Sequence, residues 1–124
     1  MGLSTATCET VILVVEDEPL IRLAAIMLVE RLGYRALEAA NADEAISLLE
    51  AHAEITIIFT DVQMEGSMDG IALTHWAAGR WPPLRFIIVS GGMTPKLHEI
   101  PPGAAFLAKP YADAAVGQLI AEFA

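Results

Sequence analysis

Cysteine and basic residues are scarce in this chain of 124 residues. Its one cysteine, Cys8, has no partner within the chain, which excludes an intramolecular disulfide. Seven Lys and Arg residues stand against sixteen Asp and Glu residues, giving a net charge of -9. Because surfaces that bind nucleic acid or anionic lipid need clustered Lys and Arg, this balance argues against both kinds of partner.

Long hydrophobic runs are also missing. The longest run, Leu23 to Val29, is far shorter than the about 20 residues of a membrane-spanning helix. The N-terminus has neither the basic start nor the apolar stretch of a signal peptide. We therefore expect a cytoplasmic location, a flexible tail over residues 1–8 and one domain over residues 9–124.

Short apolar strands and helical segments alternate along the rest of the chain. Val11 to Val15 and Ile55 to Thr60 are continuous β-branched runs, typical of strands buried on both faces. A weaker strand is expected at residues 34–38, and two further strands are expected at residues 84–90 and 104–108. Five strands separated by helical patterns favour βαβ units and a parallel sheet.

Helical segments follow the first, second, third and last of these strands. They are expected from Pro19 to about Leu32, from Asn41 or Asp43 to about His52, from Ile71 to Gly79 and from Asp113 to Ala124. Residues 91–102 leave room for only a short helix around residues 96–99. The predicted fold is α/β, flavodoxin-like and doubly wound, with a five-stranded parallel sheet of order 2-1-3-4-5 and a shortened helix 4.

Carboxylates gather where this sheet would bind a ligand. Ligands of such folds lie at the carboxyl ends of the strands, at the point where the strand order reverses. The first strand ends in Glu16, Asp17 and Glu18, and the third ends in Asp61. Because their mutual repulsion is costly without a cation, we expect Mg²⁺, which suits carboxylates, waters and a phosphate. The alternative for residues 16–18 is a solvated acidic turn at a helix N-terminus.

A hydroxyl and a lysine stand at the ends of the fourth and fifth strands. Lys109 is one of only two lysines, and it directly follows the fifth strand. Ser90 ends the fourth strand and is followed by Gly91 and Gly92, which would let a phosphate oxygen approach closely. An exposed strand-end lysine and a simple turn are the alternatives for these two residues.

The chain, with these carboxylates, a hydroxyl and a lysine at the ends of its strands, resembles the response-regulator receiver domain of two-component signalling. The resemblance covers about residues 9–124, and Met1 with its short tail favours the single-domain type. The matching segments are Val15–Glu18, Phe59–Met64, Met68–Gly70, Ile88–Gly91 and Ala108–Pro110. Such a domain catalyses only its own phosphorylation and dephosphorylation, so we do not expect an enzyme.

The resemblance implies the chemistry of the acidic group. Asp61 would accept phosphate from the phosphohistidine of a histidine kinase or histidine phosphotransferase. Asp17 would bind Mg²⁺ directly together with Asp61, and Glu16 would act through water. The backbone carbonyl of Gln63 would be a further ligand of the ion.

It also implies roles for the strand-end residues. Ser90 and Lys109 would hold the phosphoryl oxygens, so that positioning and charge do most of the catalysis. Phe106 occupies the position of the switch aromatic. The Lys109–Pro110 bond would be cis, with the lysine directed into the crevice.

The chain departs from the family pattern in three places. Glu16 stands where many receivers have Asp, which lengthens the side chain by one methylene. The loop after Asp61 is one residue longer than usual, and Glu65 replaces a common proline. The segment between Ser90 and Lys109 is about three residues shorter than is typical, which shortens helix 4.

Other functions and contexts stay open at this point. The chain could be a receiver domain excised from a hybrid sensor kinase. A Mg²⁺-dependent aspartyl-phosphate phosphohydrolase would need a second Asp where this chain has Gln63. The first helix is apolar all round from Leu23 to Val29, which indicates either an exposed partner site or a broadly buried helix.

Overall fold

The computed structural model describes residues 10–92 and 95–124, and the predicted tail over residues 1–8 lies outside this range. The described residues form five strands, four α-helices and a short 3-10 turn. The elements in chain order are β1 (Val11–Val15), α1 (Pro19–Arg31), β2 (Arg35–Ala39), α2 (Ala42–Ala51), β3 (Ile55–Asp61), α3 (Gly70–Arg80), β4 (Arg85–Ser90), the 3-10 turn (Leu97–Glu99), β5 (Ala105–Ala108) and α4 (Asp113–Phe123).

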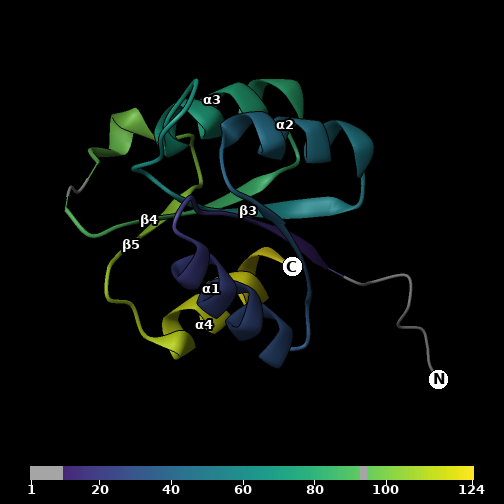
Figure 1. The fold of residues 1–124 in the computed structure, drawn as a ribbon, viewed down its shortest axis with the longest axis vertical. Helices are drawn as coiled ribbons and strands as arrows, with labels where there is room; N and C mark the ends of the chain where they lie inside the picture. The colour runs from purple at the N-terminus through teal and green to yellow at the C-terminus, as the bar shows by residue number, and fades with distance from the viewer. Residues whose placement is uncertain (1–9, 93–94) are drawn as a thin grey trace.

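The strands form one parallel sheet in the order β2-β1-β3-β4-β5. Helices α1 and α4 cover one face, and α2 and α3 cover the other (Figure 1). This confirms the doubly wound fold predicted from the sequence. The strand order reverses between β1 and β3, so the carboxyl ends of these two neighbouring strands define the crevice of the fold.

Continuous apolar runs make β1 and β3 the centre of the sheet. Leu13 and Ile58 are fully buried in the core on the α2 and α3 side, whereas Ile12 and Ile57 are fully buried on the α1 and α4 side. Alternate side chains point to opposite faces of a strand, so a sheet covered on both faces needs apolar residues at every position.

Local signals in the sequence set the ends of the helices. Pro19 stands at the first turn of α1, and Gly33 follows the end of that helix with a φ of +95°. Asn41 caps α2, because its side chain accepts a hydrogen bond from the backbone N–H of Glu44 at 2.9 Å. Asp69 caps α3 in the same way through Ala72 N–H, at 2.8 Å.

The segment between β4 and β5 is as short as expected. The one regular element in its described part is the 3-10 turn. This turn takes the place of the shortened helix that the sequence predicts between β4 and β5, and the helix labelled α4 is the later one, after β5. Ile100 anchors the segment in the core, and His75 Nε2 on α3 donates a hydrogen bond to the backbone carbonyl of Glu99 at 2.6 Å. Within the described part of the chain, no helix has both the length and the apolar character needed to cross a membrane.

A close backbone contact at Gly70 fixes α3 against the end of β3. A Cβ at this position would lie 1.9 Å from the carbonyl oxygen of Asp61. We expect Gly70→Ala to lower the free energy of unfolding by about 1–3 kcal/mol or more, because α3 must shift away from the strand. Gly79→Ala in the same helix is the control, since nothing lies within 4 Å of its added Cβ. Urea unfolding measures both, and equal stability of the two variants would contradict this packing.

Candidate functional site

The carboxyl ends of β1 and β3 carry an acidic crevice of about 640 Å³. One carboxylate oxygen from each of Glu16, Asp17 and Asp61 lies within 4.8 Å of the other two. Glu16 and Asp61 are buried, whereas Asp17 is more exposed. Oxygen ligands at this spacing are the donors that Mg²⁺ takes in proteins, so the chemistry of this group fits the ion.

Lys109 reaches the crevice from the end of β5. Its Nζ lies 3.2 Å from Glu16 Oε1 and 3.4 Å from Asp61 Oδ1. The Lys109–Pro110 peptide bond is cis, as expected. The lysine thus bridges two buried carboxylates from the first and third strands, and it offsets part of their mutual repulsion.

The two charged groups perturb each other's proton binding. Burial raises the pKa of the Glu16 carboxyl, and the nearby charge of Asp61 raises it further. The hydrogen bond from the Glu18 N–H and the charge of Lys109 act in the opposite direction. Burial lowers the pKa of Lys109, but the carboxylates of Asp61 and Glu16 outweigh that effect, so its pKa is raised. Lys109 therefore holds its proton more tightly than a free lysine does, and the Glu16 carboxyl releases its proton less readily than a free glutamate does.

Ser90 and Gln63 lie close to this group in different ways. Ser90 is buried at the end of β4, one residue after the Val89 that pairs with Asp61. Its backbone carbonyl accepts a hydrogen bond from Lys109 N–H at 2.8 Å. Gln63 is exposed and lines the crevice. The six residues that the sequence singled out on this edge are thus grouped at one end of the sheet: Glu16, Asp17, Asp61, Gln63, Ser90 and Lys109.

Two contributors to the site were not assigned a role from the sequence. Glu65 of the lengthened loop lines the crevice, and its backbone N–H lies 3.4 Å from Asp17 Oδ2. Arg22 donates from Nη1 to the backbone carbonyl of Glu16 at 2.9 Å. In the sequence, Arg22 stands four residues after Glu18, a spacing that indicates at most a pair on the helix surface and gives no sign of a contact with the Glu16 carbonyl.

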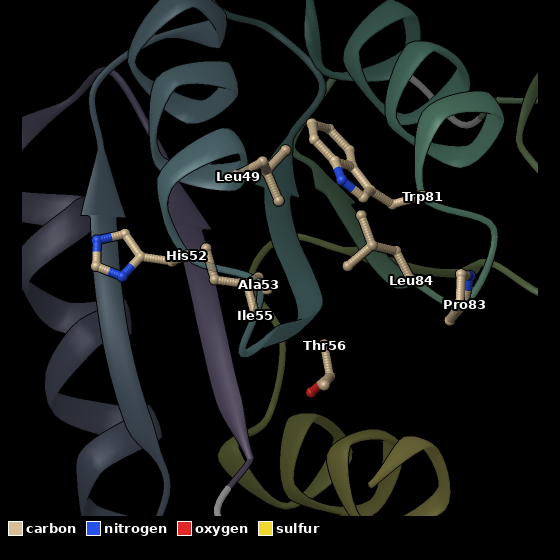
Figure 2. Close-up of a pocket in the computed structure, with 8 residues that line it drawn as sticks. All are labelled: Leu49, His52, Ala53, Ile55, Thr56, Trp81, Pro83 and Leu84. Atoms are coloured by element: carbon tan, nitrogen blue, oxygen red, sulfur yellow. The ribbon is translucent and has the colours of Figure 1, made fainter.

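A second, apolar pocket of about 180 Å³ lies at the opposite end of the sheet. It is lined by Leu49, His52, Ala53, Ile55, Thr56, Trp81, Pro83 and Leu84 (Figure 2). In Figure 2 the Trp81 indole lies beside Leu49 and Leu84, whereas the His52 ring is turned away from them. These residues come from the end of α2, the start of β3 and the segment that precedes β4, so the pocket takes no part in the acidic site at the carboxyl ends of the strands.

The fold and the site agree with a comparison against protein families. The response regulator receiver domain matches residues 12–121. The chain belongs to this family. As a receiver domain of two-component signalling, it is a phospho-acceptor, and the phosphohydrolase alternative raised from the sequence is not favoured.

Relatives of the receiver domain include parts of larger signalling proteins. The chain is 34% identical over 104 residues to the sensor kinase CckA of Brucella abortus, matching 81% of this chain and 11% of that protein. It is 40% identical over 91 residues to the cyclic di-GMP phosphodiesterase RocR of Pseudomonas aeruginosa, matching 71% of this chain and 22% of that protein. The chain therefore spans only a small part of these curated relatives.

Solved receiver structures show the same fold. The receiver domain of the hybrid histidine kinase CckA superposes with a TM-score of 0.75 at 32% identity, covering 91% of this chain and 97% of that one. A receiver domain from Clostridium thermocellum superposes with a TM-score of 0.85 at 23% identity, covering 92% of this chain and 93% of that one.

The raised pKa of Glu16 predicts a pH-dependent stability. Between its ordinary pKa of 4.5 and the raised value, the folded protein holds more protons than the unfolded chain. Its stability therefore falls as the pH rises through this window. Glu16→Gln has no such proton, so we expect its stability relative to the wild type to be higher above this window than below it, in metal-free buffer.

Urea unfolding with EDTA at pH values below and above this window measures this difference. Glu54→Gln is the control of opposite sign, because a hydrogen bond from His52 lowers the pKa of Glu54. That variant should lose stability relative to the wild type as the pH rises. A Glu16→Gln difference that stays constant or falls with pH would contradict the burial argument.

Proposed function

We propose that Asp61 is the residue that accepts the phosphoryl group, from the phosphohistidine of a histidine kinase or histidine phosphotransferase. The observation that carries the proposal is the position of its carboxylate, which ends β3 beside Lys109 and within 4.8 Å of oxygens from Glu16 and Asp17. A carboxylate oxygen of Asp61 attacks phosphorus, and the bond from phosphorus to the donor imidazole breaks. Beyond its own phosphorylation and dephosphorylation, we assign no catalysis to the domain.

The other residues of the crevice stabilise the charge of this transfer. We propose that Asp17, Asp61 and the Gln63 carbonyl hold Mg²⁺, with Glu16 acting through water. When bound, the ion neutralises charge on the phosphoryl oxygens. Lys109 Nζ turns from the two carboxylates to a phosphoryl oxygen, and the Ser90 hydroxyl donates to another.

Phe106 is proposed as the residue that responds to phosphorylation. It pairs with Ile88 across β4 and β5, is half-buried and packs against the core on the α2 and α3 side. Movement of Ser90 towards the phosphoryl group vacates space beside β4, which Phe106 fills because a void next to a large ring is costly. A phenylalanine has no hydroxyl to hold it outward, so the phosphoryl group shifts a population between two states.

Helix α1 is the proposed docking surface for the phosphohistidine donor. Of the two readings left open by the sequence, the structure supports the exposed one, since Leu20 is 76% exposed, Leu23 54% and Met27 50%. Ile21 is also exposed and lines the acidic crevice, so the apolar surface adjoins Asp61. A donor with an apolar helical surface would cover these side chains while presenting its phosphohistidine to the crevice.

The cytoplasmic location expected from the sequence stays a prediction.

Phosphorylation at Asp61 can be read from the intact mass after incubation with acetyl phosphate and Mg²⁺. The wild type should gain one phosphoryl group, and EDTA should abolish the gain. Asp61→Asn should gain none, because an amide is not a nucleophile at this position. Asp69→Asn is the matched control, since Asp69 lines the same crevice and asparagine preserves its cap on α3. An undiminished adduct on Asp61→Asn, or no adduct on the wild type, would overturn the proposal.

If the donor protein docks on α1, a variant of this surface should slow phosphoryl transfer from a kinase but not from acetyl phosphate. Leu23→Ala should slow transfer from a phosphorylated histidine kinase about fivefold or more, using any kinase that a transfer screen finds active on the wild type. Its phosphorylation by acetyl phosphate should be unchanged, because that small donor needs no docking surface. Equal slowing with both donors, or with neither, would argue against this role of α1. Radiolabelled transfer assays give both rates.

A further inference from the structure

Arg22 connects three segments beside the acidic crevice. It lies near the start of α1, and its side chain is 19% exposed. Its Nε donates to Glu38 Oε1 on β2, and its Nη1 donates to the backbone carbonyl of Glu16, each at 2.9 Å. The guanidinium therefore ties the turn after β1 to both its own helix and the neighbouring strand.

The Glu16 carbonyl belongs to the peptide group that leads into Asp17. The N–H of Glu16 continues the sheet by donating to the Ala39 carbonyl at 3.0 Å. Oε2 of the Glu16 side chain accepts a hydrogen bond from the N–H of Glu18 at 3.2 Å. Because a peptide group is planar, a hydrogen bond to its carbonyl also fixes the nitrogen on which Asp17 begins. The direction in which the Asp17 side chain leaves the backbone thus depends on the bond from Arg22.

We propose that Arg22 is a positioning residue for the phosphoryl-transfer site. It holds the peptide plane between Glu16 and Asp17 so that the Asp17 carboxylate faces Asp61 across the crevice. The inference rests on the proposed function, because it assigns to Asp17 the part of a Mg²⁺ ligand. Arg22 itself touches neither the phosphoryl group nor the ion, and it acts through the backbone.

The geometry of the contact explains why arginine is needed. A guanidinium is a flat fork whose N–H groups point in fixed directions, so Arg22 serves Glu38 and the Glu16 carbonyl at the same time. Lysine has the same charge but a single nitrogen on a flexible stem, and it does not reproduce this fork. The Glu38 side chain is 60% exposed, so the charge of this ion pair contributes little, but its oxygen holds the guanidinium in the orientation that brings Nη1 to the Glu16 carbonyl. Glutamine at position 38 keeps an oxygen that accepts this hydrogen bond.

The test compares Mg²⁺ binding by the full chain and three variants, followed by amide NMR shifts during titration with the metal alone. Arg22→Lys should weaken Mg²⁺ binding about tenfold, as expected for residues that orient metal ligands. Glu38→Gln should change it little. Arg31→Lys is the matched control, because Arg31 lies on the same helix and pairs with Asp113, away from the crevice.

Two further readouts separate positioning from a general loss of structure. Urea unfolding in EDTA should give similar stabilities for Arg22→Lys and Arg31→Lys. In acetyl phosphate reactions, Arg22→Lys should need more Mg²⁺ for half-maximal rate, while saturating Mg²⁺ restores most of the rate. Unchanged Mg²⁺ affinity in Arg22→Lys, or an equal loss in Arg31→Lys, would overturn the inference. If the wild type itself shows no Mg²⁺-dependent shifts, the proposed function fails, and the inference fails with it.

Discussion

The site depends on the contact between Lys109 and two buried carboxylates. Nζ lies 3.2 Å from Glu16 and 3.4 Å from Asp61, and Lys109 is the one basic side chain among the described residues that line the crevice. A sheet that brings the ends of β1 and β3 together also brings their negative charges together. The lysine at the end of β5 compensates part of this repulsion, and the remaining negative charge is what a divalent cation would balance. A phosphoryl group on Asp61 would change the contacts of Lys109 with these two carboxylates, so phosphorylation would alter the structure around the site.

The fold could be predicted from the sequence because its signals are local. The β-branched runs of β1 and β3 favour strands that are buried on both faces, and Gly33 and Asn41 fix helix ends through their own backbone and side-chain chemistry. The predicted strand and helix bounds differ from the observed ones by a residue or so. Strand β2, for example, was expected over 34–38 and runs over Arg35–Ala39. Such ends are set by hydrogen bonds to neighbouring strands, which a single segment does not encode.

The grouping of the candidate residues could be predicted from the sequence, but their contacts could not. The sequence placed Glu16, Asp61 and Lys109 at one edge, since parallel strands end together. It did not indicate that the longer Glu16 side chain reaches Lys109, or that Arg22 holds the Glu16 carbonyl. Both contacts join side chains and backbone of different segments, so they depend on how those segments pack against one another. The exposure of α1 was likewise undecided, because an all-round apolar helix shows its buried face only once packed.

The central claim is that this crevice binds a phosphoryl group on Asp61, with its charge shared between Lys109 and a metal ion. A crystal structure of the protein with Mg²⁺ and beryllofluoride, a mimic of the phosphoryl group, tests it most directly. We expect beryllium bonded to a carboxylate oxygen of Asp61, Mg²⁺ in contact with Asp17 and the Gln63 carbonyl, and Lys109 Nζ moved from Glu16 to a fluoride. Beryllofluoride bound elsewhere, or Lys109 still paired with Glu16 beside an occupied Asp61, would contradict the account.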